Sequence, residues 1–310
     1  MVIEVRNLVK RYKEVLALDH FNLEVAQGEI LGLLGPNGCG KTTAIHSILS
    51  VLKYDKGEIR LFGEPMSPTA YELKQEIGLV PQEVAVFEHL TVRENIDYFC
   101  SMYVEDKTRR RELVGEAIAF VGLEEYTKFF PKKLSGGLKR RLNIACGIAH
   151  RPKLIFLDEP TVAVDAQSRN FILEGIRRLN REGATILYTT HYLEEAENLC
   201  TRIVIMDRGR NIAQGTNEDL KNMIDTREII RIEIANLSEA ARADMESLPH
   251  LAEIRTVGEA LELSFERGAN NLSNLVRWLD DNGLEYQDLY SRKPSLNEVF
   301  LALTGKELRD

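Results

Sequence analysis

The hydrophobic pattern of the first 220 residues predicts short strands that alternate with helices. Apolar and polar residues alternate over residues 2–6 and 21–25, which is typical of strands with one exposed face. Residues 29–35, EILGLLG, form a continuous apolar run, as expected of a strand buried in the middle of a sheet. Further strands are expected in GEIRLFG, IGLVPQ, KLIFLDEP, ATILYTTH and RIVIMD, and helices in TTAIHSILSVL, in residues 167–180 and from Tyr192 onward. This alternation favours an α/β fold with a largely parallel, covered sheet.

Two parts of the chain depart from this alternation. Residues 91–150 form a mostly helical block. From about residue 226 the order becomes strand, helix, strand, strand, helix, strand, which predicts a small ferredoxin-like α+β domain over residues 226–305. A last helix, with a capping box at Ser295 and Glu298 and an apolar stripe that ends at Leu303, is expected to pack onto this domain.

Composition narrows the class of protein. The chain carries 48 acidic and 40 basic residues, a formal charge of −8, which disfavours non-specific nucleic-acid binding. Its four cysteines include no C-x-x-C pair, so we expect reduced thiols in a cytosolic protein and no structural zinc. No apolar run approaches the ~18 to 20 residues of a membrane-spanning helix, and the N-terminus is unlike a secretory signal. A partner would have to supply any membrane part.

The segment GPNGCGKT matches the phosphate-binding pattern G-x-x-x-x-G-K-[ST] between an apolar strand and a helix. Glycines allow backbone N–H groups to approach a phosphate closely, and the following helix presents its positive end. Lys41 is expected to reach the β- and γ-phosphates, and the Thr42 hydroxyl to bind magnesium. A plain glycine-rich turn is the alternative, which the lysine and threonine in register disfavour. The expected nucleotide-binding residues of the loop are Gly35, Asn37, Gly38, Cys39, Gly40, Lys41, Thr42 and Thr43.

Two acidic residues end the apolar segment LIFLDEP. Asp158 comes at the carboxyl end of the predicted strand, which is the edge where open α/β sheets bind ligands. Its carboxylate is expected to hold magnesium, commonly through water. Glu159 is the candidate to polarise the attacking water. Helix capping or simple solvation is the alternative for two acids in this place.

His191, at the end of ATILYTTH, is expected on the same sheet edge, where its ring could donate to the γ-phosphate or orient the water. A structural histidine is the alternative. Gln82 closes another strand and could sense magnesium and water, with an ordinary loop glutamine as the alternative. Tyr12 could stack on adenine, although one tyrosine in KRYKE does not decide this.

A second candidate phosphate receptor lies in the segment LSGG. Ser135 can cap the following helix, while Gly136 and Gly137 leave its first N–H groups open to an anion. The alternative is a tight turn before a helix whose basic residues 139–141 form a solvated face.

Together these motifs resemble the nucleotide-binding subunit of an ABC transporter over residues 1–220. The motifs of that family occur in this chain in the family's order: GPNGCGKTT, Gln82, LSGG, LIFLDEP, Asp165 and His191. The resemblance implies a P-loop NTPase core of the ABC type, with an antiparallel β subdomain and a helical subdomain at about residues 91–150. It also implies ATP and Mg²⁺, with Thr42, Gln82 and Asp158 at the metal and Lys41, Glu159 and His191 at the reacting phosphate.

The resemblance further implies a head-to-tail dimer around two ATP molecules. In that family, Ser135, Gly136 and Gly137 would bind the γ-phosphate of ATP held by the partner, and Asp165 would lie in a loop at the dimer contact. Each subunit would then contribute half of each site.

Several segments are similar to ATPases of drug-exporter type, including those related to daunorubicin resistance and sodium efflux: LKRRLNIACGI, HYLEEAENLC, RIVIMDRGRNIAQGT and PSLNEVFLALTG. This similarity implies ATP-powered export of a drug, ion or lipid-like substrate through a separate permease. The chain would then be peripheral on the cytoplasmic face of the cell membrane. Two alternatives remain: a soluble ABC ATPase that acts on nucleic acid or ribosomes, and a regulatory module without turnover.

The sequence departs from the family pattern at a few positions. Leu138 replaces the glutamine that commonly follows LSGG, and Ala163 and Ala166 stand where glycine and proline are more usual. Cys39 occupies a variable position of the phosphate loop. Beside a helix N-terminus and Lys41, its thiol is expected to have a lowered pKa, unless it is only a small residue that fills a small space.

Overall fold

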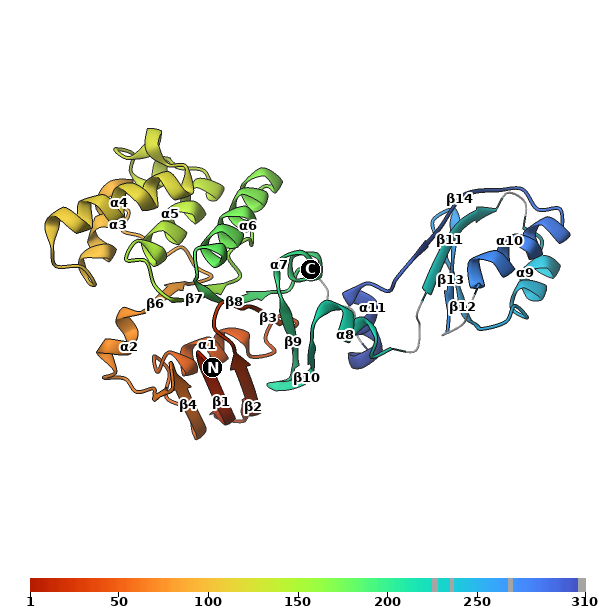
Figure 1. The fold of residues 1–310 in the computed structure, drawn as a ribbon, viewed down its shortest axis with the longest axis horizontal. Helices are drawn as coiled ribbons and strands as arrows, with labels where there is room; N and C mark the ends of the chain where they lie inside the picture. The colour runs from red at the N-terminus through yellow and green to blue at the C-terminus, as the bar shows by residue number, and fades with distance from the viewer. Residues whose placement is uncertain (225–227, 235–236, 267–269, 306–310) are drawn as a thin grey trace. The chain divides into compact units, whose positions relative to one another are not determined.

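The computed structural model describes residues 1–224, 228–234, 237–266 and 270–305, and the chain divides after Gln214 into two compact units (Figure 1). A six-stranded sheet in the order β10-β9-β3-β8-β7-β6 forms the centre of the first unit. The pairs β3–β8, β3–β9, β6–β7 and β7–β8 are parallel, which confirms the predicted sheet. The strands are β3 (Ile30–Leu34), β6 (Ile77–Val80), β7 (Leu154–Asp158), β8 (Thr185–Thr190), β9 (Arg202–Asp207) and β10 (Arg210–Gly215).

The central strands are buried and mainly apolar because each side of the sheet carries its own core. On β7, Ile155 and Leu157 pack with α4 (Lys107–Val121), α5 (Gly136–Ile148) and α6 (Ala166–Arg181). The alternate residues Leu154 and Phe156 pack on the other side, with α1 (Lys41–Ile48) and the N-terminal strands. A strand covered on both sides reads as a continuous apolar run, as in the sequence.

An antiparallel sheet lies on the α1 side, in the order β2-β1-β4-β5. It contains β1 (Ile3–Tyr12), β2 (Val15–Val25), β4 (Lys56–Leu61) and β5 (Glu64–Pro65). In Figure 1 the helical block lies on the opposite side of the central sheet. It contains α3 (Val92–Ser101), α4, α5 and two short 3-10 segments, and α2 (Tyr71–Gln75) precedes β6. The antiparallel and helical subdomains expected from the family resemblance are therefore both present.

The second unit has the predicted ferredoxin-like fold. Its strand order is β12-β13-β11-β14, with antiparallel neighbours, which is the order of the split β-α-β fold. Leu263 and other alternate strand residues form a core with the two helices on one face of the sheet. The elements are α8 (Asn217–Lys221), β11 (Glu228–Ile234), α9 (Glu239–Met245), β12 (Leu251–Val257), β13 (Ala260–Phe265), α10 (Asn271–Asp281), β14 (Tyr286–Arg292) and α11 (Leu296–Thr304).

The last helix has the predicted capping box. The Ser295 hydroxyl accepts from the backbone N–H of Glu298, and the Glu298 carboxylate accepts from the N–H of Ser295. Arg292 of β14 also donates to this carboxylate at 2.9 Å, which joins the helix to the sheet. The prediction for Leu303 is wrong, because this residue ends the apolar stripe at the surface and is 39% exposed.

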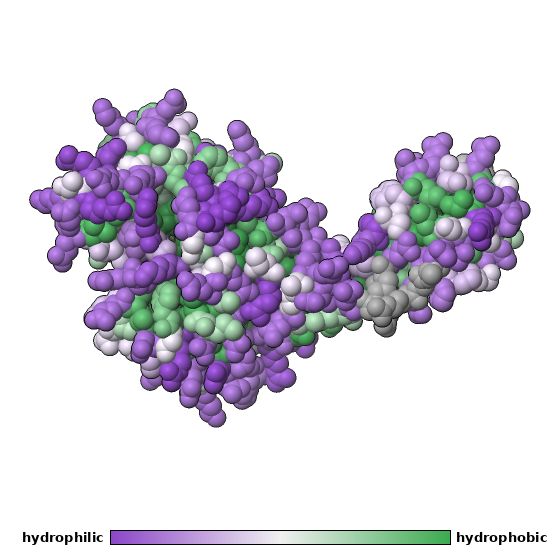
Figure 2. Space-filling model, in the orientation of Figure 1, coloured by the Kyte–Doolittle hydropathy of each residue, from purple (hydrophilic) through white to green (hydrophobic). Residues whose placement is uncertain are grey.

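The surface of the molecule is mainly hydrophilic on the face drawn in Figure 2, where hydrophobic residues show in small groups. Among the described residues, no helix has both the length and the apolar character needed to span a bilayer.

The core of the second unit offers a stability test. Leu263 is fully buried, so Leu263→Ala is expected to lower the free energy of unfolding of this unit by about 3 kcal/mol. The single tryptophan of the chain, Trp278, lies in α10, so its fluorescence during denaturation reports on this unit. The control Leu303→Ala removes an exposed leucine and is expected to change the free energy of unfolding by ~0.5 kcal/mol or less. Equal losses in the two variants would contradict the described core.

Candidate active site

The phosphate loop connects the buried strand β3 to the first residue of α1. Gly40 caps the helix with a φ of 114°, a left-handed conformation that favours glycine. A Cβ at this position would lie 2.6 Å from the carbonyl oxygen of Ala17, so any side chain would also push β2 away. The loop therefore needs glycine here for both its conformation and its packing.

Lys41 is held inside this loop. Its side chain is 5% exposed, and its ammonium group donates to the carbonyl oxygens of Gly35 at 2.8 Å and Pro36 at 3.3 Å. The same group lies 3.1 Å from Oε1 of Glu159. A buried cation is costly unless anions or carbonyl groups surround it, and here both do.

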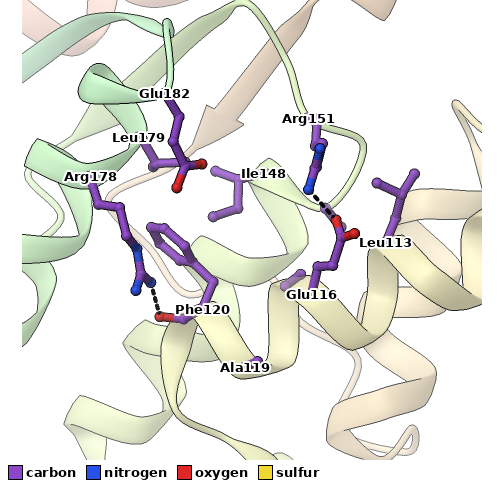
Figure 3. A pocket seen from close by; sticks show the side chains of 11 residues that line it. Leu113, Glu116, Ala119, Phe120, Ile148, Arg151, Arg178, Leu179 and Glu182 are labelled. Atoms are coloured by element: carbon purple, nitrogen blue, oxygen red, sulfur yellow. Dashed lines mark hydrogen bonds and ion pairs between the residues drawn. The ribbon is translucent and has the colours of Figure 1, made fainter.

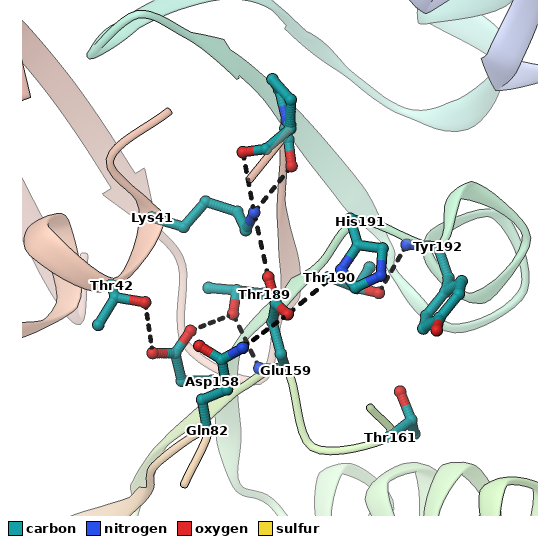
Figure 4. Close-up of polar contacts among 12 residues, drawn as sticks. Lys41, Thr42, Gln82, Asp158, Glu159, Thr161, Thr189, Thr190, His191 and Tyr192 are labelled. Atoms are coloured by element: carbon teal, nitrogen blue, oxygen red, sulfur yellow. Dashed lines mark hydrogen bonds and ion pairs between the residues drawn. The ribbon is translucent and has the colours of Figure 1, made fainter. Parts of the chain in front are cut away.

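Side-chain oxygen atoms from α1, β7 and β8 meet beside the lysine (Figure 4). The Thr42 hydroxyl donates to Oδ2 of Asp158 at 2.8 Å, and the Thr189 hydroxyl donates to Oδ1 at 2.6 Å. A hydroxyl and a carboxylate are hard oxygen ligands, as Mg²⁺ prefers, and this ion commonly takes its other ligands from phosphates and water. The pair Thr42 and Asp158 therefore fits magnesium.

Three side chains converge on the carboxylate of Glu159, which is 4% exposed (Figure 4). Besides the ammonium of Lys41, Nε2 of Gln82 donates to Oε2 at 3.3 Å, and Nδ1 of His191 lies 3.2 Å from the same oxygen. The histidine contact has the distance of an ion pair but not the alignment of a hydrogen bond. The loops after β6 and β8 thus bring both residues to the end of β7.

The backbone of Glu159 is itself constrained. Its φ of 46° lies in the left-handed region, which costs about 1 kcal/mol or more for a residue with a side chain. The backbone N–H donates to the carbonyl oxygen and the hydroxyl of Thr189, at 3.2 and 3.0 Å. These bonds to β8 hold the carboxylate toward Lys41.

A cavity of about 320 Å³ opens over the phosphate loop. The lining residues of the β1–β2 hairpin (15–17) and of the turn at 208–209 were not predicted, because neither the apolar and glycine residues nor Arg208 belong to a chemical motif. It is lined by Val15, Leu16, Ala17, Asn37, Gly38, Cys39, Gly40, Lys41, Thr42, Thr43, Gln82, Glu159, Arg208 and Gly209. Tyr12 is not among them; it ends β1, is 45% exposed and lies under the ammonium of Lys10.

A second cavity, of about 360 Å³, lies between α4, α5 and α6 (Figure 3). Three of its four charged residues have partners within the chain: Arg151 pairs with Glu116 at 2.6 Å, and Arg178 donates to the carbonyl oxygen of Phe120 at 2.8 Å. None of the predicted site residues lines it. This cavity is therefore separate from the candidate site at the phosphate loop.

The segment LSGG begins α5. The Ser135 hydroxyl accepts from the N–H of Leu138 at 3.3 Å, as predicted for a helix cap. The two glycines differ, because a Cβ on Gly137 would lie 2.2 Å from Oγ of Ser168, whereas a Cβ on Gly136 would meet only the Ala163 carbonyl oxygen at 3.8 Å. Contacts within the chain therefore explain why residue 137 is a glycine, but they do not explain why residue 136 is one. Residues 135–137 do not line the cavity over the phosphate loop.

The alternative of a solvated basic face at residues 139–141 is wrong for Arg140, which is 6% exposed. Its guanidinium donates to the carbonyl oxygen of Pro81 at 3.2 Å, next to Gln82. Arg141 packs over the ring of Phe171, with 3.9 Å between its guanidinium carbon and the ring centre.

Asp165 caps α6. Its carboxylate accepts from the N–H and the hydroxyl of Ser168, both at 2.8 Å, and these bonds lower the pKa of Asp165 below its ordinary value. Ser168 is also the residue that contacts Gly137. The Asp165 loop and the LSGG segment of one chain are therefore packed together.

The departures from the family pattern have local explanations. Leu138 packs against the apolar cluster of the helical block. Ala163 has a φ of 59°, a left-handed conformation in which glycine would be unstrained. Ala166 is the first residue of α6, a position where both proline and alanine are compatible with the helix.

The expectation of a lowered pKa for Cys39 is wrong. The residue is 5% exposed, and burial raises the pKa of its thiol above the ordinary value although the charge of Lys41 acts in the opposite direction. The alternative, a small residue in a small space, is what the structure shows.

Comparison with known proteins gives matches over the whole chain. Residues 18–162 match the ABC transporter family, and residues 215–304 match the family described as ATP-binding protein DrrA1-3-like, C-terminal domain. The linearmycin resistance ATP-binding protein LnrL of Bacillus subtilis is 37% identical over 100% of both chains. The daunorubicin resistance ATP-binding protein DrrA2 of Streptomyces coeruleorubidus is 36% identical over 96% of this chain and 92% of that protein. The Nod factor export ATP-binding protein I of Burkholderia thailandensis is 36% identical over 99% of this chain and 98% of that protein.

Solved structures agree with these relatives. An ATP-binding subunit of an ABC transporter matches 72% of this chain and 93% of its own, with a TM-score of 0.66 and 28% identity. A dimeric, post-hydrolysis state of the ATP-binding cassette MJ0796, bound to ADP and Pi, matches 69% of this chain and 98% of its own, with a TM-score of 0.64 and 27% identity. The fold, the phosphate loop with its converging carboxylates and these full-length relatives lead to one conclusion: the chain belongs to the ABC transporter family, as an ATP-binding subunit with ATPase activity and a DrrA-like C-terminal domain.

Proposed function

We propose that this chain powers the export of a substrate through a separate membrane permease, on the cytoplasmic face of the cell membrane. The observation that supports ATP hydrolysis as the energy source is that Lys41, Gln82 and His191 all contact the buried carboxylate of Glu159. The relatives named for linearmycin resistance, daunorubicin resistance and Nod factor export match nearly the whole chain, which supports an export role.

The phosphate loop residues would bind the nucleotide. Lys41 lies in the cavity wall, where its ammonium is close enough to the loop backbone to bind the β- and γ-phosphates. Thr42 and Asp158 would hold Mg²⁺, and the bound ion would neutralise charge on the phosphates. Gln82 contacts Glu159 rather than Asp158, so its role at the metal stays a prediction. Adenine stacking on Tyr12 stays a prediction as well.

Glu159 and His191 would act on the attacking water. The Glu159 carboxylate can accept the hydrogen bond of a water, and so fix the direction of attack on the γ-phosphate. His191 lies beside the same oxygen, where its ring can donate to the γ-phosphate. Lys41 would shift its ion pair from Glu159 to the phosphates when ATP binds, which frees the carboxylate for water.

The LSGG segment would complete the site of a second copy of the chain. Gly136 is exposed and has open space around it, so its small size serves no packing within the chain. The helix start at the exposed Gly136, next to the cap residue Ser135, suits a phosphate that comes from outside. Two chains would then enclose two ATP molecules, with Asp165 at the contact between them.

A cluster of exposed apolar residues after β6 suits the permease. Val84, Phe87, Tyr98, Met102 and Tyr103 are between 38% and 57% exposed, and the ring centres of Phe87 and Tyr98 lie 4.8 Å apart. A contiguous apolar patch on a surface marks a site of protein contact, and the permease would cover these side chains. Nucleic acid is not part of the proposal, because the chain has a formal charge of −8.

Buried asparagines connect this cluster with the catalytic residues. Asn143 of α5 donates to the carbonyl oxygen of Pro81 at 3.1 Å and accepts from the N–H of Ala85 at 3.0 Å. Asn95 of α3 bonds both backbone groups of Phe87, at 2.7 and 3.0 Å. Movement of the loop that carries Gln82 would therefore reach α3, α5 and the permease together.

The role of Glu159 can be tested by Glu159→Gln. The amide keeps the size of the side chain but is a poor acceptor for a water proton, so kcat for ATP hydrolysis is expected to fall by about 100-fold or more. ATP binding should remain, and the protein should accumulate as an ATP-bound dimer in gel filtration. A variant that hydrolyses ATP at the normal rate would refute the assigned role.

The role of the LSGG segment can be tested by Gly136→Asp. The new carboxylate has space within the chain, so the melting temperature should change little, but it would repel a phosphate from a second chain. ATP-dependent dimers should be lost and ATP hydrolysis should fall by about 10-fold or more. Gly115→Asp is the matched control, because Gly115 lies in α4 of the same helical block and a Cβ there would meet nothing within 4 Å. Equal behaviour of the two variants would argue against the shared site.

A further inference from the structure

A second buried carboxylate lies close to the catalytic residues. Glu195 of α7 (Leu193–Leu199) is 5% exposed. Its Oε2 accepts hydrogen bonds from the hydroxyls of Tyr188 at 2.6 Å, Thr161 at 2.8 Å and Thr190 at 3.1 Å. These three donors are at most 1% exposed, so the bonds are shielded from water. Hydrogen bonds of this kind stabilise the charged form of a buried carboxylate.

The donors come from the segments that carry the proposed catalytic residues. Thr161 follows Glu159 by two residues, and Thr190 directly precedes His191. The Thr190 hydroxyl also accepts from the backbone N–H of Tyr192 at 2.9 Å, as Figure 4 shows. The residues on both sides of His191 are thus bound to one carboxylate, directly or through one hydroxyl.

A cation from α6 completes this arrangement. Nε of Arg169 lies 3.4 Å from Oε1 of Glu195, and the guanidinium lies over the ring of Tyr192, 4.7 Å from its centre. The backbone N–H of Arg169 donates to the carbonyl oxygen of Asp165 at 2.9 Å. Glu195 therefore connects the start of α6, which carries Asp165, with the loop of His191.

The proton positions are consistent with a fixed network. Burial and the neighbouring Glu195 raise the pKa of Tyr188 well above its ordinary value, so the phenol keeps its proton and stays a donor. The hydroxyls of Thr161 and Thr190 do not titrate. At neutral pH all three donors can therefore point at the same oxygen.

We propose that Glu195 is a positioning residue for ATP hydrolysis, which holds the backbone on both sides of His191 and thereby places its ring beside Glu159. The inference rests on the role proposed above for His191. Glu195 does not line the nucleotide cavity, so its effect should fall on the chemical step rather than on ATP binding.

The main test is Glu195→Gln, which keeps the shape of the side chain and removes its charge. We expect kcat to fall about 10-fold, as for other residues that orient a catalytic group, with KM for ATP unchanged. In the His191→Ala background, Glu195→Gln should cause no further loss of kcat, because both changes remove the same interaction. A role in stability alone would instead give equal losses of kcat in the two backgrounds.

Glu194→Gln is the matched control, because Glu194 is the neighbouring, more exposed residue in the same helix, and its kcat should equal that of the wild type. If Glu195→Gln does not fold, Thr190→Val interrupts the same connection next to His191 and is expected to lower kcat several-fold with unchanged KM.

The outcomes separate the two proposals. If His191→Ala hydrolyses ATP slowly and Glu195→Gln hydrolyses it at the wild-type rate, the inference about Glu195 is overturned and the role proposed for His191 is kept. Loss of ATP affinity without loss of kcat, or additive losses in the double variant, also overturns it. His191→Ala with the wild-type rate removes the role proposed for His191, and the inference falls with it.

Discussion

A carboxylate that is 4% exposed is stable as an anion only when cations or hydrogen-bond donors surround it, and Glu159 has such groups from three directions. The ammonium of Lys41 comes from α1, the amide of Gln82 from the loop after β6, and the ring of His191 from the loop after β8. The parallel order β3-β8-β7-β6 brings these loops to one edge of the sheet. The fold of the first unit thus places three partners around one buried charge.

The same convergence suits a site that changes when ATP arrives. In the proposed function, the phosphates of ATP would compete with Glu159 for Lys41, so binding of ATP would alter the surroundings of the carboxylate. Gln82 lies in a segment that is bonded to α3 and α5 through Asn95 and Asn143, and the exposed apolar cluster begins there. A change at the γ-phosphate can therefore reach the helical block through contacts that are already present in the chain.

Motifs with strict geometry were predictable from the sequence. The phosphate loop was assigned from its G-x-x-x-x-G-K-[ST] motif, and Asp158 and His191 because parallel strands of a covered sheet end at a common edge. The structure brings these residues together. The ferredoxin-like order of the second unit followed from the alternation of its strands and helices. Leu303 was predicted to be buried, but helical spacing alone cannot show where the covered face of α11 ends.

Other features depend on tertiary packing and carry no local signal. Residues 15–17 line the cavity because a hairpin lies over the loop, although they contain only apolar side chains. The thiol of Cys39 was expected to be acidic from its neighbours in sequence, but burial has the larger effect. The network around Glu195 joins hydroxyls from two distant segments, which no spacing in the sequence reveals.

The central claim is that each ATP site is built from two chains, and mixing two variants with low activity tests it most directly. A Lys41→Ala chain keeps its LSGG segment, and a Gly136→Asp chain keeps its phosphate loop, so a mixed dimer holds one intact site. With random pairing, about half of the dimers are mixed, and about a quarter of the wild-type rate of ATP hydrolysis should return. If the mixture stays as inactive as its two components, the site is not shared between chains.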